Sequence, residues 1–216
     1  MRNLERRIGA VTDSSGLASI VDVPLTAQKQ EEAVLPNIEF LIAAGSPPTS
    51  FTDAVASVHD RSVLLVDGWT NGRLDQINRA SRDVSKLFDH IVGALMRARD
   101  DIKNGLRPQN QNFSAALRAP AGQIVTPVTS THQAGVLQSG HGNGTLPAGV
   151  AAAPVALEQT LNKIKHQNEA QANFRIDRGR HMLIICANKQ NGSPDCVLEF
   201  DVQEFCRLCQ AAWDTL

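Results

Sequence analysis

The chain has 216 residues, of which 42% are hydrophobic and 20% charged, so it can build a packed core in at least part of its length. Its net charge is −1, only 4% of its residues are aromatic, and it has no tyrosine, which disfavours strongly basic nucleic-acid binders and sites built on aromatic stacking. The N-terminus lacks the apolar stretch of a secretory signal, and no run of about eighteen apolar residues occurs. We therefore expect a cytoplasmic protein that does not cross a membrane.

The first part of the chain, residues 1–104, is predicted to be an antiparallel helical bundle. Apolar residues recur every three or four positions over 26–44 and again over 51–65, and a short amphipathic helix is expected at 2–9. Thr49 or Ser50 can cap the helix that begins at residue 51. Several amphipathic helices joined by short connections favour a bundle with an apolar interior.

The longest apolar repeat predicts one continuous helix over 73–104, of about thirty residues and ~45 Å. Gly105 and Pro108 end it, and a turn at 67–72 joins it to the preceding helix, which should pack antiparallel. We expect Trp69, in that turn, to cover the core of the helical hairpin. The stripe repeats without a slip through Leu74, Ile77, Ser81, Val84, Phe88, Ile91, Leu95, Ala98 and Ile102.

The middle of the chain, residues 105–155, is predicted to be a flexible linker or a long insertion. It holds half of the ten prolines and nearly half of the fifteen glycines, and its only charged residues are Arg107 and Arg118. Such a composition buries too little apolar surface to offset the entropy lost on ordering. His132 and His141 lie in this segment and are expected to be solvated.

The last part, residues 156–216, is predicted to be a small α-β-β-β-α unit whose strands form an antiparallel meander. A helix follows Pro154, and Asp201 and Glu204 give the final helix a start that resembles a capping box. About sixty residues are few for an independent domain, so we expect this unit to pack on the helices or to oligomerise. The predicted elements are a helix over 157–170, strands over 172–176, 181–187 and 196–200, and a helix over 202–215.

The cysteines all fall within this last part: Cys186, Cys196, Cys206 and Cys209. Four thiolates are a possible zinc ligand set, but only one pair is close in sequence, and that pair lies on the apolar face of a predicted helix. Buried free cysteine behaves as a small hydrophobic residue. We therefore predict core packing and no metal, with these four residues as the candidate ligands if a metal binds.

Basic residues gather near the first helix and the first hairpin of the last part. If the helix and the hairpin meet, they form a patch for a phosphate or an acidic partner, and the alternative is a solvated surface. The candidate binding residues are Lys163, Lys165, His166, Arg175, Arg178, Arg180 and His181.

Arg82 and His90 lie on the polar side of the predicted long helix and are the candidate catalytic residues. An arginine can bind an RNA phosphate while a histidine moves the proton of the 2′-hydroxyl. The pair resembles the Arg-x(4–6)-His motif of HEPN-type ribonucleases, which are helical bundles, although seven residues separate it here. His59 or Asp60 on the preceding helix is expected to contact Arg82 if the two helices pair.

The sequence lacks a phosphate-binding glycine loop, a zinc-protease motif, a serine-hydrolase motif and a kinase signature. Long apolar stripes without a catalytic motif favour a protein–protein interaction or assembly component that acts through helical surfaces and self-associates or binds a protein partner. The alternative is a HEPN-like ribonuclease or RNA-binding protein that uses arginine and histidine side chains. No cofactor is predicted.

Overall fold

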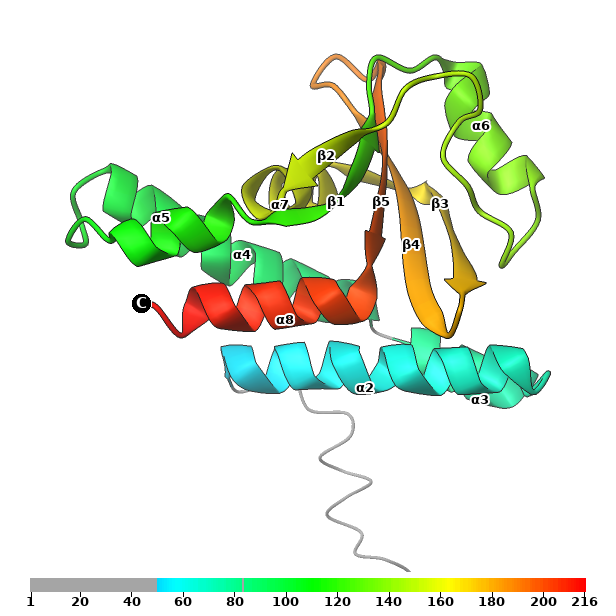
Figure 1. Ribbon diagram of the computed structural model, residues 1–216, viewed down its shortest axis with the longest axis horizontal. Helices are drawn as coiled ribbons and strands as arrows, with labels where there is room; N and C mark the ends of the chain where they lie inside the picture. The colour runs from blue at the N-terminus through cyan, green and yellow to red at the C-terminus, as the bar shows by residue number, and fades with distance from the viewer. Residues whose placement is uncertain (1–49, 83) are drawn as a thin grey trace, which may run out of the picture. The chain divides into compact units, whose positions relative to one another are not determined.

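A five-stranded antiparallel sheet with the strand order β2-β1-β5-β4-β3 forms the centre of the structure (Figure 1). The structure is a computed structural model and describes residues 50–82 and 84–216. The strands are β1 (Pro120–Val125), β2 (Ala153–Ala156), β3 (Gln167–Asp177), β4 (Arg180–Asn188) and β5 (Pro194–Asp201). The helices are α2 (Phe51–Thr70), α3 (Leu74–Ser81), α4 (Val84–Lys103), α5 (Gln111–Leu117), α6 (Ser130–Gln138), α7 (Leu157–Lys165) and α8 (Val202–Trp213). The helices predicted at 2–9 and 26–44 lie outside the described residues.

The last part of the chain has the predicted order of elements, in which the three strands β3, β4 and β5 lie between helices α7 and α8. Strands β3, β4 and β5 pair as an antiparallel meander. The tight turn between β3 and β4 places Arg178 at a φ of 52° and Gly179 at 81°, a left-handed conformation that glycine adopts without cost. The Asp201 side chain caps α8 by accepting hydrogen bonds from the backbone N–H groups of Gln203 (2.9 Å) and Glu204 (3.3 Å).

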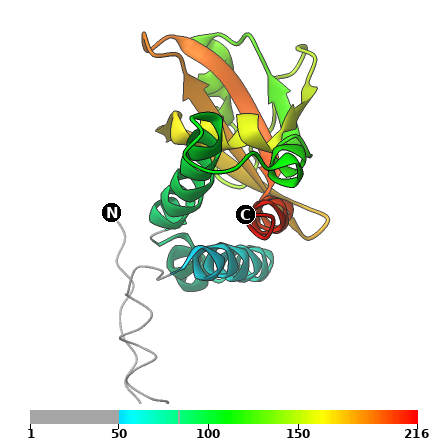
Figure 2. The ribbon, with the colours of Figure 1, turned by 90° about the vertical axis from the view of Figure 1, so that its left-hand side faces the viewer.

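The two faces of the sheet bury different sets of side chains because successive residues of a strand point to opposite sides. Ile185, Leu198 and Phe200 pack with helices α2, α4, α5, α7 and α8 in the larger core. Ile184 and Val197 pack with α6 and its flanking loops in a smaller core. Figure 2 shows α2, α4 and α8 together on one side of the sheet.

The long helix predicted over 73–104 is wrong in one respect, because the structure has two helices there. Helix α3 ends at Ser81, and Arg82 has an extended backbone (φ −66°, ψ 133°) before α4 begins at Val84. The Arg61 guanidinium on α2 donates to the backbone carbonyl oxygens of Arg79 (3.3 Å) and Arg82. A side chain 21 residues away thus satisfies the carbonyl groups at the end of α3, where a continuous helix would have bonded them internally.

The flexible linker predicted over 105–155 is also wrong, because this segment contains α5, β1, α6 and β2. Strand β1 pairs with both β2 and β5 and so extends the meander into a larger sheet. Six large apolar side chains of the segment are buried against neighbouring elements, whereas Leu106 and Leu137 are exposed. The glycines and prolines therefore mark turns between short elements. Long-range strand pairing offsets the loss of conformational entropy on ordering, which the composition of the segment had predicted to be too large. The buried residues include Phe113, Leu117, Val125, Val128, Val136 and Val155.

The helices before residue 104 and the elements after residue 156 share the larger core. The described residues belong to one compact unit, so the described part does not divide at 104 and 156. None of the described helices combines the length and the apolar character that crossing a bilayer requires.

Candidate functional site

Helices α2 and α8 lie side by side and antiparallel (Figure 1), because the start of α2 contacts the end of α8. The rings of Phe51 and Trp213 stack with centroids 4.3 Å apart and an interplanar angle of 13°. One turn farther along, Gln210 Nε2 donates to Thr52 Oγ1 at 3.3 Å. The helix pair is thus fixed at one end by an aromatic stack and a hydrogen bond.

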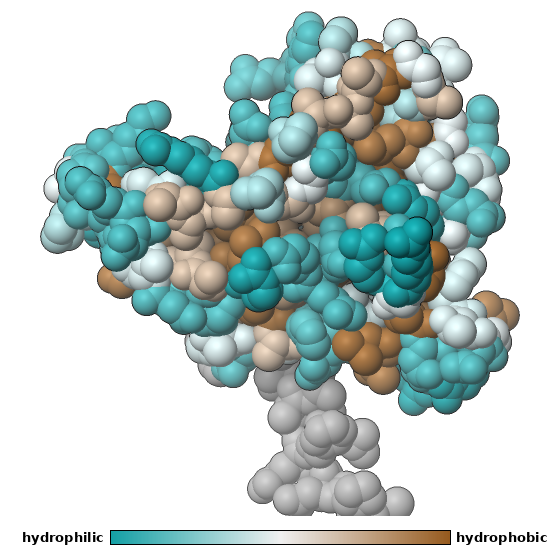
Figure 3. All heavy atoms as spheres, viewed as in Figure 1, coloured by the Kyte–Doolittle hydropathy of each residue, from teal (hydrophilic) through white to brown (hydrophobic). Residues whose placement is uncertain are grey.

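A groove of about 880 Å³ follows this helix pair. On α2, Thr52, Ala56 and His59 recur at helical spacing along it, and Val63, 45% exposed, continues the same stripe. Figure 3 shows hydrophobic side chains among hydrophilic ones over this part of the surface. From α8 and its ends the groove is lined by Asp201, Gln203, Glu204, Cys206, Arg207, Gln210, Ala211 and Asp214, together with Val55 of α2 and Arg180 of β4. The small side chains of Ala56 and Ala211 allow another helix to approach closely.

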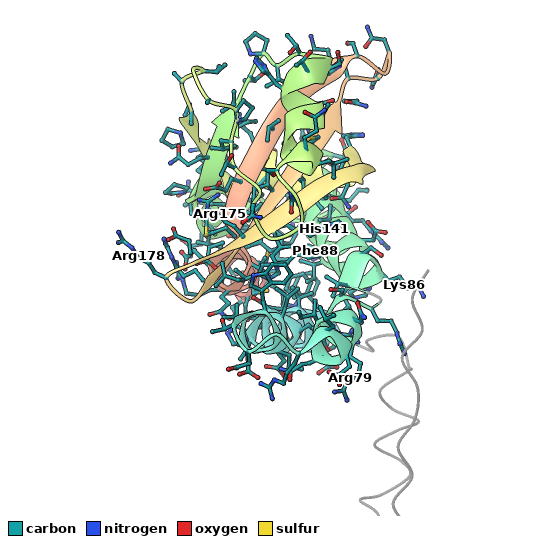
Figure 4. The ribbon with its side chains drawn as sticks, turned by 90° about the vertical axis from the view of Figure 1, so that its right-hand side faces the viewer. Arg79, Lys86, Phe88, His141, Arg175 and Arg178 are labelled. Atoms are coloured by element: carbon teal, nitrogen blue, oxygen red, sulfur yellow. The ribbon has the colours of Figure 1, made fainter. Side chains whose placement is uncertain are left out.

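A second site is a cavity of about 200 Å³ between the helices and the sheet. Its walls are mostly apolar, and Phe88 of α4, one of its lining residues, lies between the helical layer and the sheet in Figure 4. The lining residues are Val58, Arg61, Ser62 and Leu65 of α2, Ala80 and Ser81 of α3, Val84 and Phe88 of α4, Phe174 of β3, His181 and Leu183 of β4, and Val202 of α8.

The cavity contains a buried serine–histidine pair. Ser62 and His181 are 2% and 8% exposed, and His181 Nδ1 lies 3.2 Å from Ser62 Oγ. The rings of His181 and Phe174 are arranged edge to face, with centroids 5.8 Å apart and an interplanar angle of 89°. Burial lowers the pKa of His181 to about 4, so its imidazole is neutral at pH 7.

This pair is poorly suited to nucleophilic catalysis. A general base works best with a pKa near the working pH, and burial moves that of His181 well below it. In a catalytic triad the second ring nitrogen is oriented by a carboxylate, whereas Nε2 of His181 has no hydrogen-bond partner among the described residues. The pair instead supplies two polar groups to an apolar cavity, which is a common arrangement for ligand binding.

The predicted basic patch is divided between opposite ends of β3. Lys165 and His166 precede the strand and Arg178 follows it, so an 11-residue strand of roughly 35 Å separates them. Figure 4 shows Arg178 projecting outward beyond the end of the strand, apart from Arg175. The helix and the hairpin therefore do not meet as expected.

Several of the predicted binding residues have internal partners. Lys163 forms an ion pair with Asp195. Arg175 forms a bidentate ion pair with Glu199, in which Nη2 of the arginine lies 2.9 Å from Oε1 of the glutamate. Arg180 Nη2 lies 3.1 Å from Asp177 Oδ2. Hydrogen bonding to Glu199 raises the pKa of Arg175. His181, the remaining member, lies in the cavity.

The predicted catalytic residues Arg82 and His90 do not share a helix, because α3 ends before Arg82 and His90 lies on α4. The expected contact of His59 or Asp60 with Arg82 is replaced by the bond from Arg61 to the Arg82 carbonyl, and His59 Nδ1 lies 3.5 Å from Asp60 Oδ1.

The structure instead groups His90 with Arg97, which lies two turns farther along α4, in a groove of about 490 Å³. Arg107 lines the same groove and lies 3.4 Å from Asp101 through Nε. Sequence reasoning missed Arg97 because the HEPN-like motif places its arginine before the histidine, whereas Arg97 follows His90. The other lining residues are Ser50, Phe51, Thr52, Asp89, Gly93, Ala94, Ala98 and Trp213.

All four cysteines are buried free thiols, as the core-packing prediction requires. Burial raises the pKa of Cys186 and Cys206 to about 12 and that of Cys196 to about 11, and raises that of Cys209 strongly. Cys186 lies in the smaller core, whereas Cys206 and Cys209 lie in the larger one. Within residues 50–82 and 84–216, no three histidine, cysteine or acidic side chains are grouped to hold a metal ion.

Trp69 does not cover a helical hairpin core but packs beside β3 and a glycine-rich loop. The Trp69 and Phe174 rings are arranged edge to face, with centroids 4.8 Å apart. A Cβ atom added to Gly142 would lie 2.0 Å from the Trp69 ring. The Asn173 side chain holds this loop by donating to Gly140 O (2.9 Å) and accepting from Gly142 N (3.2 Å). His141, expected to be solvated, is exposed in the loop (Figure 4).

The described residues thus present a helical groove on α2 and α8, an apolar cavity that contains Ser62 and His181, and a smaller groove around His90 and Arg97. The sequence pattern gave no signal for the cavity, because Ser62 and His181, the buried polar pair in it, are 119 positions apart. Among known proteins, no family model, curated sequence or solved structure matches this chain.

Proposed function

We propose that the protein is an assembly component that binds a second copy of itself through the face formed by α2 and α8. The observation that carries this proposal is the groove along the two helices, with small side chains at Ala56 and Ala211 and an exposed apolar side chain at Val63. Exposed apolar surface bordered by polar residues is typical of protein contact sites.

The charges around the groove favour a second copy as the occupant. In a twofold dimer the same patch meets itself, so a patch with a strong net charge would repel its copy. Here the carboxylates of Asp201, Glu204 and Asp214 are nearly balanced by the guanidinium groups of Arg180 and Arg207 along the groove.

The size of the face sets the expected affinity. Helix α2 has 20 residues and α8 has 12, which gives lengths of ~30 Å and ~18 Å and, at ~10 Å width each, a footprint of roughly 500 Å². Stable interfaces bury about 800 Å² per partner, so this contact should be reversible, with a dissociation constant of about 1–100 µM.

Sedimentation equilibrium of the full chain over about 1–200 µM tests the proposal. We expect a monomer–dimer equilibrium that Ala56→Arg or Ala211→Arg shifts to monomer without lowering the melting temperature. Ala115→Arg, at an exposed site on α5, is the matched control and should leave the dimer intact. A monomer at the highest concentration, or a dimer that both groove variants retain, would contradict the proposal.

A second candidate is RNA binding or cleavage at the groove that contains His90 and Arg97. The observation that favours it is the placement of His90, Arg97 and Arg107 along one groove, where they could contact successive phosphates. Asp89 and Asp101 also line this groove and reduce its positive charge, which is why this function ranks second.

Titration of a fluorescent single-stranded RNA with the full chain at several salt concentrations tests the RNA function. Arg97→Gln should weaken binding and lower the slope of log affinity against log salt by about one if Arg97 contacts a phosphate. Arg82→Gln is the control, because Arg82 lies outside this groove. Equal effects of the two substitutions would count against the groove, and loss with Arg82→Gln alone would favour the original Arg82–His90 hypothesis.

A further inference from the structure

The cavity between α2, α3 and the β3–β4 hairpin differs from an ordinary packing defect. Its volume is about 200 Å³, larger than the ~150 Å³ apolar cavity known to hold benzene. The cavity opens to the surface at Ser81, which is exposed, so a small molecule can enter it. A molecule with one ring and a short substituent fits such a volume.

The polar groups of the cavity indicate which end of a ligand they would bind. Ser62 and His181 satisfy each other through Oγ and Nδ1 at 3.2 Å, which leaves Nε2 of His181 without a partner among the described residues. If the Ser62 hydroxyl donates to Nδ1, the neutral imidazole carries its proton on Nε2 and is a hydrogen-bond donor. A ligand that offers an acceptor atom would complete this arrangement.

Arg61 adds a positive charge to the same wall. Its Nη1 atom donates to the carbonyl oxygens of Arg79 and Arg82, which fixes the guanidinium at the end of α3. The remaining N–H groups of Arg61 have no hydrogen-bond partner among residues 50–82 and 84–216. A guanidinium held in this way recognises a carboxylate with two parallel hydrogen bonds. Among the described residues that line the cavity, Arg61 is the only charged one apart from the titratable His181.

We propose that this cavity binds a small aromatic or branched aliphatic carboxylic acid. The hydrocarbon part would lie among Val58, Leu65, Phe88 and Phe174, and the carboxylate would face Arg61 and the free nitrogen of His181. The proposal is independent of the assembly function, because none of the cavity residues lines the groove between α2 and α8.

The first experiment is calorimetric titration of the full chain with benzoate, phenylacetate and cyclohexanecarboxylate, with benzamide as a neutral analogue of benzoate. A ligand of about ten heavy atoms should bind with a dissociation constant of roughly 10 µM to 1 mM. Benzoate should bind at least about fivefold more tightly than benzamide because only benzoate carries the charge that pairs with Arg61. No binding of any acid at ~5 mM would overturn the proposal, and equal binding of benzoate and benzamide would overturn the assignment of Arg61.

Two substitutions locate the binding. Ala80→Leu places a larger side chain in the cavity and should weaken benzoate binding about tenfold or more while the melting temperature stays equal or rises. Arg61→Gln should weaken benzoate about tenfold and benzamide less than about twofold, whereas Arg118→Gln, at an exposed site at the end of α5, should change neither. Binding that survives Ala80→Leu in a folded variant would place the ligand elsewhere and refute the proposal.

If Ala80→Leu fails to fold, Ser81→Leu on the same helix fills the cavity from its exposed rim and gives the same test. Proton NMR of the wild-type chain then supplies a second measurement, because a bound acid should shift the imidazole signals of His181. An unchanged His181 signal at saturating benzoate would also refute the proposal.

Discussion

Burial of His181 makes the stability of the fold depend on pH between about 4 and 6.5. The imidazole is 8% exposed, and burial lowers its pKa to about 4 from its usual 6.5. Between these values the unfolded chain holds a proton that the folded chain does not. Stability is therefore fully present above about pH 6.5 and is lost as the pH falls toward 4.

The size of this loss follows from the two pKa values. At about pH 5, the unfolded chain is stabilised by proton binding by about 2 kcal/mol relative to the folded chain, whereas at about pH 7.5 the difference is below about 0.1 kcal/mol. The loss is a substantial part of the free energy of unfolding of a domain, which is typically about 5–15 kcal/mol.

Urea unfolding of the wild-type chain and of His181→Gln at both pH values measures this difference. The glutamine can still bond Ser62 but does not titrate, so the wild-type chain should lose about 2 kcal/mol more than the variant on acidification. Contributions from Asp67 and Glu204, whose pKa values are lowered by hydrogen bonds to Gln76 and Arg207 respectively, cancel in the comparison. His166→Gln, at an exposed position, should behave as the wild-type chain. Equal losses in wild type and His181→Gln would refute the reasoning that burial controls this histidine.

Three further predictions concern the glycine-rich loop and the thiols. Gly142→Ala should lower the free energy of unfolding by more than about 2 kcal/mol and change the tryptophan fluorescence. The backbone φ of +82° is strained for alanine, and the new Cβ atom would collide with Trp69. The control is Gly149→Ala, which has a φ of +78° but open space around it and should cost only about 1 kcal/mol. Asn173→Ala should cost about 1–3 kcal/mol and speed amide exchange across 136–144, because it leaves the N–H of Gly142 without its partner, whereas the carbonyl of Val136 keeps the hydrogen bond from Ser139 Oγ. The four cysteines should not react with a disulfide reagent at neutral pH in the folded chain, because each thiol is buried and burial raises its pKa. All four should react in urea. Rapid labelling of the folded chain would show that the core opens readily.

The sequence alone determined the elements whose signals are local. The order α7, β3, β4, β5 and α8 follows from a change of apolar period from three-to-four to two, with turn residues between the elements. Ser50 and Asp201 cap α2 and α8 because a side-chain oxygen at the first position of a helix bonds N–H groups two or three residues away. These interactions need no knowledge of the rest of the chain.

Only the tertiary structure decided the features that depend on partners distant in sequence. Residues 120–125 form a strand because β5 offers an unpaired edge, which the composition of the segment does not reveal. Helix α3 ends at Ser81, where Arg61 of another helix bonds the carbonyl groups of Arg79 and Arg82. The cavity forms where α2 brings Ser62 to His181 of β4. In each case a long-range contact offsets the loss of conformational entropy or provides a hydrogen bond to a backbone group. The local sequence pattern does not specify the distant residue that makes this contact.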